Sequence, residues 1–189
     1  MLKLKSIIPV ALLAVVISFG SCKKDEHNHG SDQENLTTLK LIFKNKASGV
    51  EQTFVYADKD GVGGNNPTQD PIILADGANY DLTLQVLDES GTTAKDITPE
   101  IITKGEEHQF FFTNSSIGTL VNVKYEDKDA KNNPIGVKNT LTSIRAGKGK
   151  FRVSLRHEPN KSAAGVKDGQ IANAGGETDI EADFDISVL

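Results

Sequence analysis

The sequence predicts an all-β protein whose antiparallel strands pack face to face as a β-sandwich. From Leu39 to the end of the chain, apolar and polar residues alternate in many short segments, as in strands that bury one face. Gly, Asn, Asp and Pro residues separate these segments, and no stretch keeps a helical period over a useful length. About nine or ten strands are expected. This number suits either one elaborated sandwich or two β units that abut.

The expected strands are recognised, in chain order, by apolar residues at every second position. These residues are Leu39, Leu41 and Phe43; Phe54 and Tyr56; Tyr80, Leu82, Leu84 and Val86; Phe110 and Phe112; Val121, Val123 and Tyr125; Phe151, Val153 and Leu155; and Ile180, Ala182, Phe184, Ile186 and Val188. In the last strand the alternate positions are expected to face water, namely Asp179, Glu181, Asp183, Asp185 and Ser187.

A short motif before one of these strands refines the architecture. Residues 74–80 read Leu-Ala-Asp-Gly-Ala-Asn-Tyr, which places Leu74, Gly77 and Tyr80 at the spacing of a tyrosine corner. The motif resembles that of immunoglobulin-like and fibronectin-like sandwiches, in which the tyrosine hydroxyl bonds to the backbone a few residues upstream. The resemblance implies an immunoglobulin-like sandwich, with the leucine in its core and the glycine in the turn.

The N-terminal segment has the layout of a secretory signal. Lys3 and Lys5 precede an apolar run over residues 7–19, and small residues then lead to Cys22. A single transmembrane helix is the alternative, but a run of about 13 residues is shorter than the roughly 20 that it needs. The cysteine after small residues resembles a bacterial lipobox. In that family the cysteine becomes the first residue and carries fatty acyl chains such as palmitate, so residues 1–21 are the expected signal peptide and Cys22 is the expected lipidation site.

The residues after the cysteine predict where the protein is displayed. Residues 24–26, Lys-Asp-Glu, resemble the signal by which Bacteroidota send lipoproteins to the cell surface, although an ordinary solvated charge run would read the same. We therefore expect a lipid-anchored protein of the outer membrane, held in the bilayer through Cys22 and exposed on the cell surface.

Three segments are expected in the chain: the signal peptide (1–21), a lipidated flexible tether (22–36) and the β-sandwich domain (37–189). The tether lacks the apolar residues that offset the entropy of ordering a chain. His27 and His29 lie within it and could hold a metal weakly, but a low-complexity spacer explains them better.

The charge of the chain argues against a nucleic-acid partner. The full sequence has 21 Lys and Arg against 26 Asp and Glu, and Lys3 and Lys5 are the only charged residues of the signal, so residues 22–189 carry a formal charge of −7. An acidic body does not attract a phosphate backbone. Cys22 is the only cysteine, so no disulfide can form within the chain.

One loop resembles the start of a calcium site. Asp58 and Asp60 stand two residues apart and a glycine follows, so both carboxylates can point at one cation. Further oxygen ligands would come from Asn65, Asn66 or Asp70. The third ligand and the later glutamate of an EF-hand are missing at the required spacing, so a solvated hairpin turn is the favoured interpretation.

Two histidines lie where neighbouring strands would meet. His108 begins one expected strand and His157 ends another, and both are in step with core-facing residues. In antiparallel neighbours a start and an end share one rim, so the two imidazoles could converge. Neutral imidazoles suit Zn or Cu, and Glu106, Glu107 or Glu158 could add an oxygen ligand. Two half-buried histidines bonded to backbone or water are the alternative.

The C-terminal half adds an expectation about function. Residues 106–109, 155–159 and 175–180 resemble a group of small Bacteroidota lipoproteins that are associated with receptor-linked uptake. The resemblance implies a ligand-binding accessory module for nutrient or metal uptake, with a TonB-dependent outer-membrane receptor as its partner. A structural or adhesive surface domain is the alternative. No nucleophile elbow, P-loop or zinc-protease motif occurs, so the sequence does not indicate an enzyme.

Overall fold

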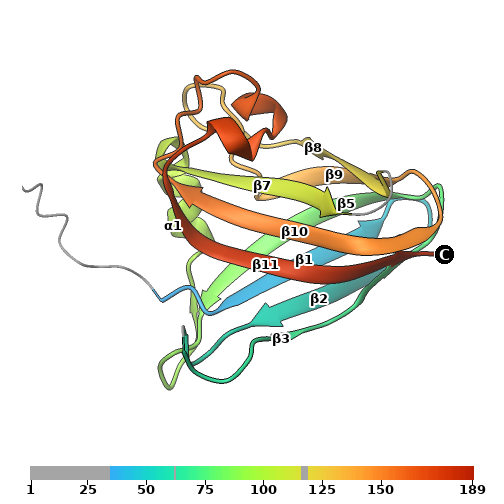
Figure 1. Ribbon diagram of the computed structural model, residues 1–189, viewed down its shortest axis with the longest axis horizontal. Coiled ribbons are helices and arrows are strands. Elements are labelled where there is room, and N and C mark those ends of the chain that lie inside the picture. Colours follow the sequence, from blue (N-terminus) through green and yellow to red (C-terminus); the bar gives the residue numbers. More distant parts are fainter. Residues whose placement is uncertain (1–34, 62, 116–118) are drawn as a thin grey trace, which may run out of the picture. The chain divides into compact units, whose positions relative to one another are not determined.

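The computed structural model describes residues 35–61, 63–115 and 119–189, which form a sandwich of eleven strands in two sheets (Figure 1). The described residues belong to one compact unit. The predicted signal peptide, Cys22 and the tether as far as Glu34 lie outside the described residues. Within the described part, no helix is long and apolar enough to cross a membrane.

The larger sheet has seven strands, all paired in antiparallel fashion. Their spatial order is β3 (Thr68–Gln69), β2 (Glu51–Ala57), β1 (Thr38–Asn45), β5 (Asn79–Asp88), β9 (Lys138–Ser143) and β8 (Val121–Tyr125), with β6 (Lys95–Asp96) paired to the end of β5. In the middle of this sheet Leu41 lies opposite Phe54 on one side and Leu84 on the other. All three are buried, as the alternating pattern predicts.

The smaller sheet has four strands and carries the candidate site. Its order is β4 (Ile72–Leu74), β11 (Glu177–Val188), β10 (Gly147–His157) and β7 (His108–Ser115). β4 runs parallel to β11, whereas the sequence predicts antiparallel pairing throughout. The chain leaves the larger sheet after β3 and, with two residues between, joins the edge of the smaller one at Ile72. The three residues of β4 are too few to carry a periodic signal.

Both sheets contribute to one hydrophobic core. Phe43 of β1 packs edge-on against Tyr80 of β5, with ring centroids 5.9 Å apart, and Phe112 of β7 stacks on Phe151 of β10 at 6.0 Å. Residues from the inner faces of both sheets belong to a single buried cluster. The all-β sandwich prediction is therefore confirmed, and the two sheets are layers of one domain.

The tyrosine corner forms as the motif predicts. The hydroxyl of Tyr80 accepts a hydrogen bond of 2.9 Å from the backbone N–H of Ala75, five residues upstream. Leu74 is buried, and Gly77 has a φ of 66°, a left-handed conformation that a side chain would strain. The corner thus fixes the path by which the chain returns from the smaller sheet into β5.

Short helices close the end of the sandwich at which β7 begins and β10 ends (Figure 1). The helix α1 (Thr98–Thr103) has Pro99 in its first turn, where the missing N–H costs nothing, and it buries Ile101 in the core. A 3₁₀ turn, η1 (Gly105–Glu107), leads directly into β7. The backbone between α1 and β7 is therefore short.

A long connection between β10 and β11 covers part of the outer face of the smaller sheet, around Phe111. It includes the 3₁₀ turns η2 (Val166–Asp168) and η3 (Ile171–Asn173). Val166 and Ala174 of this connection pack against Phe111 and bury it. The neighbours of Phe111 along β7 face the main core instead. This second cluster anchors the connection that runs from His157 to the start of β11.

Candidate metal centre

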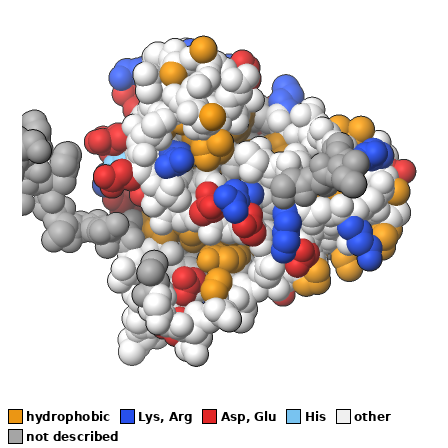
Figure 2. Space-filling model, in the orientation of Figure 1, with side chains coloured by type: hydrophobic (Ala, Val, Ile, Leu, Met, Phe, Trp, Pro, Cys, Tyr) orange, Lys and Arg blue, Asp and Glu red, His pale blue; other side chains and the backbone are white. Residues whose placement is uncertain are grey.

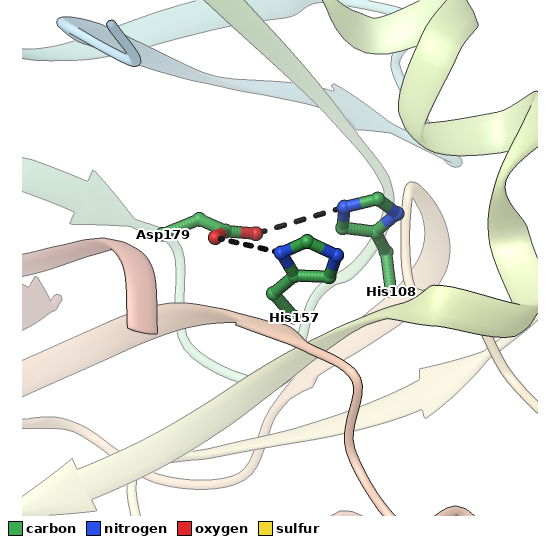
Figure 3. A group of neighbouring side chains, drawn as sticks. All are labelled: His108, His157 and Asp179. Carbon is green, nitrogen blue, oxygen red and sulfur yellow. Dashed lines mark ion pairs between the residues drawn. The ribbon is translucent and has the colours of Figure 1, made fainter. Parts of the chain in front are cut away.

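His108 and His157 face each other across neighbouring strands. β7 and β10 are antiparallel, and their last paired positions join His157 to His108. The imidazole rings stack with centroids 4.9 Å apart and planes 15° from parallel (Figure 3). The expectation that these strands are neighbours and that the two histidines meet at one rim is therefore confirmed.

A third side chain, that of Asp179 on β11, completes the group. One carboxylate oxygen lies 3.7 Å from His108 Nε2 and the other lies 3.8 Å from His157 Nδ1 (Figure 3). The three candidate ligand atoms, one from each residue, all lie within 4.8 Å of one another. Among the described residues, this is the one cluster of three or more side chains that could hold a metal ion.

A β-bulge aims Asp179 at the histidines. Leu155 of β10 pairs with Ile180 of β11, but the next residue, Arg156, pairs with Thr178, so Asp179 has no partner of its own. A bulge of this kind re-aims a side chain and breaks the strict alternation along the strand. Asp179 therefore leaves the water-facing row of acidic side chains to which the sequence pattern assigns it.

A backbone carbonyl fixes the proton on His108. The Nδ1 atom lies 3.0 Å from the carbonyl oxygen of Lys104, which can only accept a hydrogen bond. Nδ1 must therefore carry the proton, and Nε2 keeps its lone pair, directed toward Asp179. Ligating histidines are usually held in this way, with one ring nitrogen bonded to a carbonyl or carboxylate and the other free for the metal.

The burial of the three side chains decreases from the interior toward the rim. The exposed fraction is 11% for His108, 20% for Asp179 and 43% for His157, so the site opens to water on the side of His157. Figure 2 shows histidine atoms reaching the surface among acidic side chains. A metal ion can therefore reach the group without unfolding of the domain.

Burial also sets the protonation of the two inner groups. Burial lowers the pKa of His108, an effect that the Lys104 carbonyl and Asp179 only partly offset. Burial raises the pKa of the Asp179 carboxyl, although both histidines oppose this shift. A neutral imidazole is the form that binds metals, and a bound cation would stabilise the carboxylate that burial disfavours.

The glutamates expected as ligands lie elsewhere. Glu106 forms an ion pair of 2.7 Å with Lys131. Glu107 and Glu158 are exposed, and it is their backbones that meet, through a 2.7 Å bond from the Glu158 N–H to the Glu107 carbonyl. None of the three belongs to the cluster, and Asp179 takes the role expected of them. The rule that places a strand start beside a strand end puts Asp179 at the same rim, but the alternating pattern assigns its side chain to the water-facing row.

The calcium-like loop is closed by its own hydrogen bonds. Asp58 accepts a bond of 3.1 Å from the N–H of Gly61, and Asp60 accepts bonds from the backbone N–H and the side-chain amide of Asn65, at 2.8 and 2.6 Å. Asp70 accepts the N–H of Val55 at 2.9 Å, and Asn66 is exposed. These contacts are those of a hairpin turn, and among the described residues the one possible metal cluster does not include Asp58, Asp60 or Asp70.

Comparison with known proteins assigns no family, because no family model, no curated protein and no solved structure matches this chain. The chemistry of the site therefore follows from its atoms. Two imidazole nitrogens and one carboxylate oxygen form a three-ligand set that suits zinc or copper. Ligand atoms on a tetrahedral zinc stand about 3.4 Å apart, so binding requires the three ligand atoms to move closer together.

Proposed function

We propose that this chain is a lipid-anchored, cell-surface protein that binds zinc or copper at His108, His157 and Asp179 and serves as an accessory module for metal uptake. The observation that carries the proposal is the convergence of these side chains from three neighbouring strands, with the His108 Nε2 lone pair directed into the space between them. The lipobox-like Cys22 and the charged residues after it support the proposed location on the cell surface.

The distances between the three side chains favour a bound ion over direct hydrogen bonds from the histidines to Asp179. Both contacts between the imidazole nitrogens and Asp179, at 3.7 and 3.8 Å, exceed hydrogen-bond range. Two histidines that merely stabilised the rim would be expected to close on the carboxylate. The open distances instead leave room for a cation that bonds to all three groups once the exposed His157 ring turns.

An accessory role in uptake fits the accessibility of the ligands. Three protein ligands leave one position of a tetrahedral metal open, and His157 is nearly half exposed. A donor group of a partner protein can enter the open position and take the metal by ligand exchange. A TonB-dependent outer-membrane receptor is the proposed partner, because the expected location of the chain is the outer membrane.

Metal titration of the soluble form, lacking residues 1–21 and carrying Cys22→Ala, tests the proposal. His27→Ala and His29→Ala in the same protein prevent the tether from binding metal. We expect one zinc or copper ion per chain with a dissociation constant below about 1 μM. At free metal 100 times that constant, binding to the native state should raise the free energy of unfolding by about 2.7 kcal/mol.

The matched control is the same protein with His108→Ala and His157→Ala. It should lose both the tight binding and the stabilisation by metal while keeping the β-rich circular dichroism spectrum. Equal, weak binding by the two proteins would rule out the metal centre. The chain would then be better explained as a structural or adhesive surface domain.

A further inference from the structure

Lys161 is a buried cation that bonds to the turn leading to His108 of the candidate metal centre. Its side chain is 5% exposed, and its ammonium donates to the carbonyl oxygens of Gly105 at 2.5 Å and Pro134 at 2.8 Å. The third contact is an ion pair of 3.1 Å with Asp129, which is itself 1% exposed. Three donors thus meet three acceptors, which is the full hydrogen-bonding capacity of a lysine.

The contact with Gly105 connects Lys161 to the histidines. Gly105 follows Lys104, whose carbonyl oxygen accepts the proton of His108 Nδ1. Lys161 itself comes four residues after His157 in the chain. Between these points the Glu158 N–H donates to the Glu107 carbonyl at 2.7 Å. The segments 104–108 and 157–161 are therefore bonded to each other at two places, and each of them carries one of the histidines.

We infer that Lys161 is a positioning residue for the metal centre, an inference that rests on the proposed function. By holding the Gly105 carbonyl, Lys161 fixes the short turn between α1 and β7. The fixed turn keeps the Lys104 carbonyl on His108 Nδ1 and leaves Nε2 free for the metal. Outer partners that orient a ligating histidine in this manner typically change metal affinity about 10- to 100-fold when they are removed.

Packing offers a competing way to hold the same turn. Gly105 lies so close to Ile135 that a Cβ at this position would come within 2.7 Å of the isoleucine Cδ1. If this contact alone fixes the turn, Lys161 only neutralises Asp129. The experiment must therefore separate the hydrogen bond to Gly105 from the ion pair.

Two variants of the soluble protein achieve that separation. In Asp129→Asn the ion pair is lost, but Lys161 can still donate to Gly105. In Lys161→Met with Asp129→Asn, the bond to Gly105 is lost too, and no unpaired carboxylate remains buried. We expect the first variant to bind zinc nearly as tightly as the parent protein. The second should bind about 10- to 100-fold more weakly at a temperature where both are folded.

Nitrogen-15 NMR of the imidazoles supplies a readout that needs no metal. In the metal-free parent protein and in Asp129→Asn, His108 should be a single tautomer with its proton on Nδ1. In the double variant, a mixture of tautomers is expected. If the parent protein binds no zinc, the proposed function fails, but the tautomer still decides the role of Lys161.

An independent variant covers the case in which the double variant does not fold. Ile135→Val removes the Cδ1 atom that packs closest to Gly105 and leaves the Lys161 bond to the Gly105 carbonyl in place. This variant should keep the zinc affinity and the single His108 tautomer of the parent protein. A mixture of tautomers in Ile135→Val, or unchanged affinity with a single tautomer in the folded double variant, would overturn the inference.

Discussion

His108 and His157 stack with their ring planes 15° from parallel, and in this arrangement their lone pairs cannot converge on one ion. A nitrogen lone pair lies in the plane of its ring, and two nearly parallel ring planes share no point near both nitrogens where one ion could sit. His108 is held by the Lys104 carbonyl, whereas His157 is 43% exposed. The exposed ring is therefore the one that must turn when a metal binds.

We predict that zinc breaks this ring stack. Ring-current shifts of the His108 side-chain protons should change on metal addition, because the neighbouring ring rotates away, while the backbone of β7 should keep its chemical shifts. The measurement is a proton–carbon NMR titration with zinc, repeated with magnesium as the control cation. Chemical shifts that respond equally to both cations would contradict a specific rotation.

Asp179→Asn should abolish tight metal binding without harming the fold. The change removes a charged ligand, so affinity should fall by more than the roughly 10- to 100-fold typical of losing a supporting partner. Burial raises the pKa of this carboxyl, which means that the fold disfavours its charge, so the metal-free variant should be at least as stable as the parent protein. Zinc titration and thermal unfolding measure both effects.

The matched control is Asp185→Asn, which removes the same charge farther along β11. Asp185 is exposed and pairs with Lys150 at 2.7 Å on the water-facing side of the strand. The Asp185→Asn variant should bind zinc as tightly as the parent protein. A comparable loss in both variants would mean that general surface charge, and not a ligand, attracts the metal.

The difference between these two aspartates shows how far the sequence could predict the site. Strict alternation predicts which residues of β11 are buried, and it predicts that His108 and His157 lie on the same face of the sheet. Both predictions follow from the two-residue period of a strand. Alternation also assigns Asp179 and Asp185 to the same face. The bulge at Leu155 and Arg156 breaks that rule for Asp179, and a bulge depends on the pairing of two distant strands, which no local pattern records.

Prediction of the fold from the sequence was limited in the same way, because some contacts join residues that are far apart in the chain. The tyrosine corner could be predicted because its contacts span only residues 74–80. The parallel pairing of β4 with β11 joins residues more than a hundred positions apart, and the three residues of β4 are too few for a periodic signal. Lys161 was missed for the same reason, since its three acceptors come from distant loops.

Tyr80→Phe should lower the free energy of unfolding by about 1 kcal/mol, the usual net contribution of one hydrogen bond. The lost contact is the bond from the Ala75 N–H, and the ring itself remains buried. Denaturant unfolding gives the value. Tyr56→Phe is the control, because it removes a tyrosine hydroxyl that takes no part in the corner. Equal midpoints for Tyr80→Phe and the parent protein would argue against a stabilising corner.

Cys22→Ala in the full chain should prevent lipidation and leave the precursor uncleaved or mislocalised. Two acyl chains give lasting membrane attachment, because each buried methylene contributes about 0.8 kcal/mol. Detergent-phase partition of the parent protein and the variant measures the anchor. Replacing residues 24–26 by alanine is the companion variant: it should keep the lipid but lose sensitivity to protease added to intact cells. Parent protein found in the aqueous phase would refute the lipoprotein prediction.

Asp129 should make the stability of the domain depend on acid. Burial raises the pKa of this carboxyl, but the backbone N–H of Asn133 and the Lys161 ammonium outweigh burial, so the net shift is downward. A carboxyl whose pKa is lower in the folded state stabilises the fold above its unfolded value of about 3.9. That contribution is lost as the pH falls through the lower, folded value.

The parent protein should therefore lose stability steeply below about pH 4, and Asp129→Asn should lose less over the same interval. At neutral pH, Asp129→Asn should be less stable than the parent protein, because the variant leaves Lys161 buried without its counter-charge. Urea unfolding at several pH values measures both effects. Asp81→Asn is the control, since it removes a carboxylate that pairs with Lys46 at 3.0 Å on the exposed surface. Parallel pH profiles for the parent protein and Asp129→Asn would show that the ionised carboxylate does not stabilise this end of the sandwich.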